Sequence, residues 1–120
     1  MAITLQINAR NAACDAIAAL HNSGTLEFQT SADAEVATVT FGATAFGAAS
    51  AGVATANAIT ADSDATGGET TKFVTKTSGA AVILSGTVGT SGTDIVIDNT
   101  TVSAGVTVDL TAFTITVPAS

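Results

Sequence analysis

Residues 80–97 of the chain, AAVILSGTVGTSGTDIVI, decide which kind of fold this sequence can form. Two apolar stretches, residues 80–84 and 95–97, flank a segment of glycine, serine and threonine. Valine and isoleucine favour strands, whereas clustered glycine and serine favour turns. We expect VILSGTVG to form a strand, GTSG its turn and TDIVID the returning strand of a hairpin. Within that strand, Gly86 is expected to mark a bulge or a close approach of another group.

Apolar and polar residues alternate in the same way along much of residues 25–118, which predicts a series of short strands. Turn-forming residues separate these segments at intervals of about 8–12 residues, as in antiparallel sandwiches. The sequence therefore predicts a mainly β domain, an antiparallel β-sandwich or jelly roll, with one N-terminal helix. A strand is also expected over Lys72–Thr77, with Phe73 on one face and Val74 on the other. The apolar faces of the other expected strands are Leu26 and Phe28; Ala37, Val39 and Phe41; Val53 to Ile59 in a weaker pattern; Val82, Leu84 and Val88; Ile95 and Ile97; Val106, Val108 and Leu110; and, after a phase slip at Ala112–Phe113, Phe113, Ile115 and Val117.

The first 24 residues have a different pattern. Alternation of Ile3, Leu5 and Ile7 predicts an extended arm over residues 1–8, which could pair with a neighbouring molecule as an added strand. Asn8 is a candidate cap for a helix over residues 9–22, and Gly24 stands where a helix commonly ends. The expected core face of this helix is Ala13, Ile17 and Leu20, with Arg10, Asn11 and Asp15 directed elsewhere. Strands over residues 25–118 then complete a single domain of 120 residues.

The charge balance restricts the partners of the chain. The net charge is −7, and Arg10, Lys72 and Lys76 are its only cations. Proteins that bind nucleic acids or anionic membranes neutralise phosphate groups with many such residues, so we expect neither partner. The apolar runs are too short for a transmembrane helix, and Met1–Leu5 does not lead into a recognisable secretory signal. Only 11% of the residues are charged, against about 25% in an average soluble domain, which suits burial against a neighbour.

Cys14 and His21 are the only cysteine and the only histidine. A lone cysteine forms no internal disulfide, which is typical of a protein that folds in reducing cytoplasm. Seven residues on a helix span about 10 Å, which is too far for a direct thiol–imidazole pair. We expect Cys14 to be a small buried apolar residue.

Closely spaced carboxylates are the next candidates for chemistry. Asp62, Asp64 and Glu69 lie in one loop and could supply oxygen ligands to calcium, but their spacing differs from that of an EF-hand. A solvated loop is the alternative interpretation. Asp94 and Asp98 flank one strand and are separated by about 13 Å along it. A glycosidase pair needs roughly 5–10 Å, so these two residues alone do not form one.

Other catalytic or binding patterns are weaker still. Residues 66–72, TGGETTK, lack the spacing of a phosphate-binding loop and are expected to lead into a strand. No serine motif accompanies the single histidine, so hydrolase chemistry is unsupported. Carbohydrate platforms commonly use tryptophan or tyrosine, and the chain has neither. We therefore expect a non-enzymatic protein without catalytic, cofactor-binding or metal-binding residues. The phenylalanines, which we expect in the core, are Phe28, Phe41, Phe46, Phe73 and Phe113.

The order of five segments resembles a family of small virion structural proteins of tailed bacteriophages. The resemblance covers most of the chain, except the region around residues 62–81. It rests on the order and residue content of the segments and not on a catalytic motif. The segments are INARNAACDAIAAL (7–20), GTLEFQT (24–30), EVATVTFGATAFGAASAGVATANAI (35–59), GTVGTSGTDIVI (86–97) and FTITVPAS (113–120).

The resemblance implies a capsid decoration or cement subunit, similar to proteins that coat the phage head with β-rich folds. Its partners would be the major capsid protein and copies of itself, in dimers or trimers. It would be made in the host bacterial cytoplasm and located on the capsid exterior. The alternatives are a tail, connector or fibre-associated component and a carbohydrate-binding β-sandwich module. The resemblance carries no site residue over to this chain.

Overall fold

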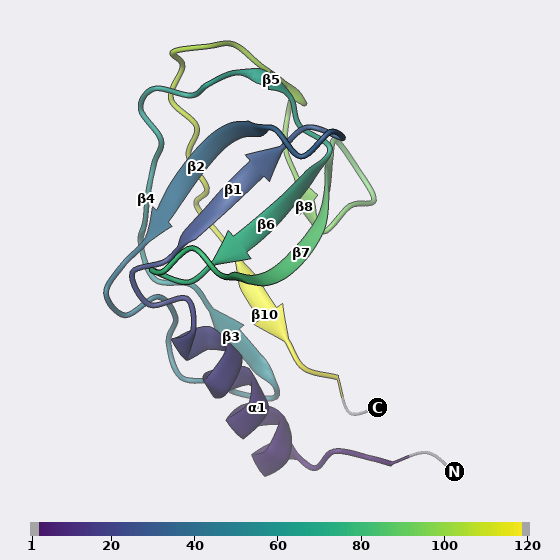
Figure 1. The fold of residues 1–120 in the computed structure, drawn as a ribbon. Helices are drawn as coiled ribbons and strands as arrows, with labels where there is room; N and C mark the ends of the chain where they lie inside the picture. The colour runs from purple at the N-terminus through teal and green to yellow at the C-terminus, as the bar shows by residue number, and fades with distance from the viewer. Residues whose placement is uncertain (1–2, 119–120) are drawn as a thin grey trace.

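The computed structural model describes residues 3–118, and within them the chain is mainly β with one helix. Figure 1 shows a curled sheet in the upper part of the molecule and the helix below it. The molecule measures 46 × 31 × 23 Å along its principal axes. The elements are α1 (Ile7–Ala19), β1 (Thr25–Gln29), β2 (Glu35–Phe41), β3 (Val53–Thr55), β4 (Ile59–Thr60), β5 (Gly68–Glu69), β6 (Lys72–Lys76), β7 (Val82–Gly89), β8 (Ile95–Val96), β9 (Thr101–Val102) and β10 (Thr114–Thr116).

The main sheet has six strands in the order β4-β2-β1-β6-β7-β8. Its neighbouring strands are antiparallel except β7 and β8, which are parallel. Two small sheets, β10-β3 and β5-β9, accompany it. The prediction of a mainly β fold with an N-terminal helix is confirmed, whereas the sandwich or jelly-roll arrangement stays a prediction.

The core lies mainly on one face of β1, β2 and β6, where the alternation in the sequence is most regular. Leu26 and Phe28 of β1 are buried, and so are Val39 and Phe41 of β2. Phe73 of β6 lies opposite Phe28 in the register and is also buried. The predicted inward faces of β1 and β2 and the predicted core position of Phe73 are therefore confirmed, since side chains two residues apart point to the same face.

The hairpin predicted for residues 82–98 is wrong. After β7 the chain loops through residues 90–94 and returns beside the end of β7, so that β8 runs parallel to it. The Asp94 carboxylate folds this loop back, because its Oδ2 accepts the Thr87 N–H at 2.9 Å and the Thr87 hydroxyl at 3.1 Å. Gly86 does permit a close approach: a Cβ there would lie 2.6 Å from Phe73 Cε1.

The strand predicted over Val106–Leu110 is also absent. Only an isolated bridge between Val108 and Asp62 forms there, and Val106 is exposed. Gly105 turns the chain with a φ of +84°, and no long strand lies beside this segment to complete a ladder. The last predicted strand is confirmed as β10, with Ile115 buried.

The helix begins at Ile7 and ends at Ala19, earlier at both ends than expected. Gln6 occupies the N-cap position without a side-chain hydrogen bond, so Asn8 is not the cap. Beyond Ala19 the chain tightens into a turn in which the His21 N–H donates to the Ala18 carbonyl, and this turn brings His21 into the core. Gly24 therefore follows the turn instead of ending the helix.

The buried face of the helix differs from the predicted one. Cys14 and Ala18 are buried, Ala13 and Ile17 are half-buried, and Leu20 is 52% exposed. The reason is that polar side chains dock the helix onto the segments beside it. These contacts are Arg10 Nε to the Val117 carbonyl (3.0 Å), Gly52 N–H to Asn11 Oδ1 (2.9 Å) and Ala49 N–H to Asp15 Oδ1 (2.7 Å).

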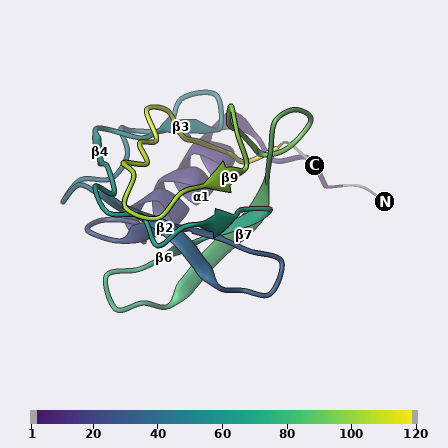
Figure 2. The same cartoon turned by 90° about the horizontal axis from the view of Figure 1, so that it is seen from above.

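Only part of the predicted arm over residues 1–8 can be compared with the structure. Met1 and Ala2 lie outside the described residues, while Ile7 and Asn8 belong to α1. Between them, residues 3–6 form no regular element, and the Gln6 backbone is extended. Figure 1 and Figure 2 both show this segment leaving the body at the end of the molecule where the C-terminus also lies.

Candidate functional site

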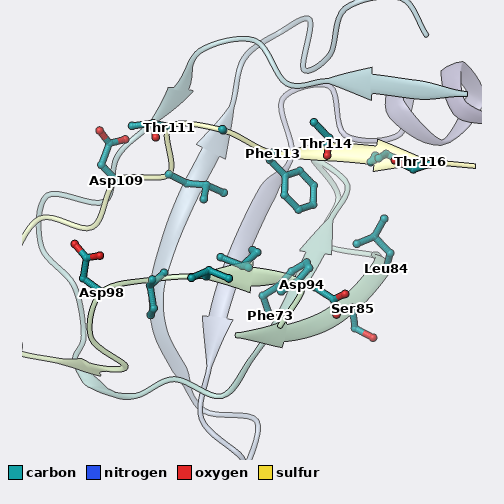
Figure 3. Close-up of a pocket in the computed structure, with 16 residues that line it drawn as sticks. Phe73, Leu84, Ser85, Asp94, Asp98, Asp109, Thr111, Phe113, Thr114 and Thr116 are labelled. Carbon is teal, nitrogen blue, oxygen red and sulfur yellow. The ribbon is translucent and has the colours of Figure 1, made fainter. Parts of the chain in front are cut away.

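A groove of about 850 Å³ lies between the end of the main sheet and the C-terminal segment. β8 forms one wall and residues 109–116, which include β10, form the other, so the two walls come from the two irregular parts of the chain. Figure 3 shows the lining side chains from both walls. The lining residues are Phe73, Leu84, Ser85, Asp94, Ile95, Val96, Ile97, Asp98, Asp109, Leu110, Thr111, Ala112, Phe113, Thr114, Ile115 and Thr116.

The inner part of the groove is aromatic and aliphatic. The rings of Phe73 and Phe113 meet edge to face with their centroids 5.8 Å apart, a favourable geometry for two aromatic rings. Phe113 projects from the C-terminal wall toward Phe73 in Figure 3. Phe73 can reach this position because Gly86, opposite it in β7, has no side chain.

Three exposed carboxylates line the same groove. Figure 3 shows Asp94 beside Ser85 at one end, and Asp98 and Asp109 together at the other end. The Asp94 carboxylate accepts hydrogen bonds from Thr87, so it holds the loop before β8 in place. The groove therefore combines an apolar interior with a negatively charged rim, a combination that disfavours anionic ligands.

Both walls of the groove are strands without a neighbour on the groove side. β8 is the last strand of the main sheet, and β10 pairs only with β3. Such edges leave backbone N–H and C=O groups free to pair with another chain. The arrangement can receive an extended segment.

A second surface lies at the α1 end of the molecule and is apolar. Leu20, directly after the helix, is 52% exposed. On the same side of the helix the outward-facing residues are alanines. We call this the α1 face; its residues are Ala9, Ala12, Ala16, Ala19 and Leu20. None of these residues is charged, and the exposed Asp15 of the same helix accepts a hydrogen bond from the Ala49 N–H.

His21 is fully buried and is part of the core. Its Nδ1 lies 3.0 Å from the Ile17 carbonyl, which can only accept, so Nδ1 carries the proton and Nε2 accepts from the Thr75 hydroxyl at 2.9 Å. The ring meets Phe41 and Phe46 edge-on. Burial lowers the pKa of His21 and outweighs the hydrogen bonds to backbone carbonyls, which raise it. The histidine is therefore held neutral.

Cys14 is buried, as expected, and has partners of its own. Its Sγ donates to the Ile115 carbonyl at 3.4 Å, whereas the imidazole of His21 is bonded to Ile17 and Thr75. The structure thus gives the thiol and the imidazole separate hydrogen-bond partners, and it ties Cys14 to β10 as a packing contact.

In the acidic loop considered for calcium, the Asp62 carboxylate bonds to backbone N–H groups. Asp62 accepts the Thr38 N–H at 2.8 Å through one oxygen and the Asp64 N–H at 3.0 Å through the other. Glu69 lies in β5, opposite Thr101 of β9. Across residues 3–118 no three metal-ligating side chains come together in a way that could hold an ion. Residues 66–72 lead into β6 through β5, as predicted.

Four of the five phenylalanines are buried, as expected for core residues. The exception is Phe113, which is half-buried and lines the groove. Asp98, which the sequence suggested only as a partner of Asp94, also lines the groove. Asp109 and the pairing of Phe113 with Phe73 were missed, because these residues are far apart in the chain and no local motif joins them.

Comparisons with protein-family models, with characterised proteins and with solved structures found no match to this chain. Within the described part of the chain, no helix is long and apolar enough to cross a membrane.

Proposed function

We propose that this chain is a non-enzymatic virion structural protein, a decoration or cement subunit on the exterior of a bacteriophage head. The resemblance of the sequence to small phage structural proteins is one support, and the surface of the molecule is the other. A sandwich or jelly-roll relationship to decoration proteins, with dimers or trimers on the lattice, forms part of the same proposal.

The observation that carries the proposal is the α1 face. Contiguous apolar surface on a protein commonly marks a site of association, because its exposure to water is unfavourable. This face consists of four exposed alanines and Leu20, and none of these residues is charged. It suits a permanent contact with a neighbouring protein.

The mechanism would be interfacial. Burial of apolar area contributes roughly 25 cal/mol per Å², so one modest contact is weak by itself. A subunit that touches several shell proteins, or another subunit already attached, gains from effective concentration. Many such contacts over a shell would resist its expansion or rupture. The net charge of −7 is compatible with a position outside the shell, away from packaged DNA.

The copy number of the chain in purified particles tests this proposal. Quantitative mass spectrometry against the major shell protein should give a ratio near one or a simple fraction of it. A handful of copies per particle would favour the alternative of a tail, connector or fibre-associated component. Absence from the particles would overturn both structural roles.

A matched pair of variants tests the α1 face. Leu20→Glu places a charge on that face and should lower occupancy on particles severalfold. Val82→Glu is the control, because Val82 is 62% exposed on β7 and lies outside the α1 face. Equal occupancy of the two variants would show that the face is not the contact.

The carbohydrate-binding alternative has one observation in its favour. The groove combines the half-buried Phe113 with the carboxylates of Asp98 and Asp109, and sugar sites use aromatic and carboxylate groups together. This alternative predicts saturable glycan binding that Asp109→Ala and Phe113→Ala both abolish. A glycan array without signal would remove it.

A further inference from the structure

The groove and the segment before the helix are complementary parts of the same chain. The groove has two strand edges and an apolar interior, and Ile3–Gln6 lies outside the helix and the sheets. We propose that Ile3–Gln6 of one copy inserts as a strand between β8 and β10 of a second copy. This inference concerns contacts between copies and does not depend on the virion assignment.

The hydrogen bonds of β10 show which of its backbone groups are free for a new strand. The Phe113 carbonyl accepts from Ala56 N–H, and Val117 N–H donates to the Gly52 carbonyl, both toward the β3 side. Alternate residues of an antiparallel strand direct their backbone groups to opposite sides. The N–H and C=O groups of Thr114 and Thr116 therefore face away from β3, on the side of the groove that these residues line.

The same alternation applies to β8. Ile97 N–H donates to the Gly89 carbonyl, so Ile95 and Ile97 direct their backbone groups toward β7. The backbone groups of Val96 then face away from β7, and the Val96 side chain is 61% exposed. An inserted strand would find pairing groups on both walls, which is the requirement for adding a strand to a sheet edge.

The segment before α1 has the pattern of such a strand. Ile3 and Leu5 alternate with Thr4 and Gln6, and Ile3 is 75% exposed while Leu5 is 37% exposed. Four extended residues span about 13 Å, which matches the length of the four-residue wall from Phe113 to Thr116. On insertion, one face of the segment would cover the Phe73–Phe113 pair and the other would remain polar.

The charge of the segment is compatible with that of the groove. Ile3–Gln6 has no charged side chain, whereas Asp94, Asp98 and Asp109 line the groove. A neutral strand can approach that rim, and an acidic one would be repelled. A segment of one copy that enters a groove of the next makes a head-to-tail contact, which closes into a ring or continues as a chain.

A complementation experiment with two full-length variants tests the inference. Ile3→Asp with Leu5→Asp disables the segment but leaves the groove intact. Val96→Glu disables the groove but leaves the segment intact. Val82→Glu is the matched control, since Val82 and Val96 are exposed to almost the same extent, 62% and 61%. All substituted positions are exposed or half-exposed, and circular dichroism checks that each variant is folded.

Sedimentation equilibrium of the purified proteins gives the result. The unmodified chain and Val82→Glu should associate in a concentration-dependent manner, and each disabled variant should associate at least tenfold more weakly. An equimolar mixture of the two disabled variants should form a 1:1 heterodimer and stop there, because it holds one working segment and one working groove per pair. A monomeric unmodified chain, a mixture that stays monomeric, or a Val82→Glu defect equal to that of Val96→Glu would overturn the inference. Each of these outcomes is independent of whether the chain is found on particles.

Discussion

The sheet formed by β1, β2 and β6 and the segment from residue 97 to 116 have similar residue types but very different structures. Both contain valine, isoleucine and threonine in alternation. In the first region each strand has at least one long partner, and most of its apolar side chains are buried. In the second region the strands have two or three residues, and much of the apolar surface is half-buried or exposed. Alternation therefore specifies a strand only where a long neighbour completes the ladder.

The largest expected effect compares one leucine from each region. Leu26 of β1 is fully buried, whereas Leu110 of the C-terminal segment is half-buried beside the groove. Leu26→Ala should lower the free energy of unfolding by about 3 kcal/mol, since it leaves a cavity in a rigid sheet. Leu110→Ala should cost about 1 kcal/mol, because solvent from the groove can enter the space. Urea denaturation measures both, and equal losses would show that the two regions are equally well packed.

The next effect concerns acid stability and the core beneath the sheet. Because burial lowers the pKa of His21, the folded state binds a proton less readily than the unfolded state, whose histidine has an ordinary pKa of 6.5. The free energy of unfolding should therefore be constant above about pH 7 and fall as the pH drops below 6.5, by at most about 1.4 kcal/mol per pH unit.

Histidine replacement provides the control for this pH dependence. His21→Gln can keep a donor toward Ile17 and an acceptor toward Thr75, and it does not titrate. The variant should lose the slope between pH 6.5 and 5, whatever its stability at pH 7.5. Persistence of the slope in denaturation curves of the variant would assign the acid sensitivity to another group. Glu27 acts only at lower pH: its burial alone would raise the pKa, but hydrogen bonds from Gln29 and Lys76 and the Lys76 charge lower it.

The smallest effect concerns the loop that joins the two regions. Asp94→Ala removes the carboxylate that accepts the Thr87 N–H and hydroxyl, both of which are exposed and can bond to water instead. The loss should be about 1 kcal/mol or less in global stability. Hydrogen exchange should nevertheless quicken at Ile97, whose N–H bonds to Gly89 in the β7–β8 pair, and stay unchanged at the β1–β6 pair. Unchanged exchange at Ile97 would show that the parallel pair does not need the Asp94 contact.

The sequence by itself determined the elements that depend on local pattern. The inward faces of β1, β2 and β6 follow from strict alternation, since every second side chain points to the same face. The helix follows from its high alanine content and lack of β-branched runs, and the burial of Cys14 and of four phenylalanines follows from their hydrophobicity. These properties depend on residues that are close together in the chain.

The tertiary structure alone decided how the strands pair at the edge of the sheet and how the helix contacts the rest of the chain. It made β8 parallel to β7, left Val106–Leu110 without a partner strand, and turned the polar residues Arg10, Asn11 and Asp15 into contacts that dock the helix. It also brought residues 94–98 and 109–116 together around one groove. The physical reason is that a hydrogen bond or a carboxylate has no effect until its partner is in place, and those partners here are up to 107 residues apart in the chain.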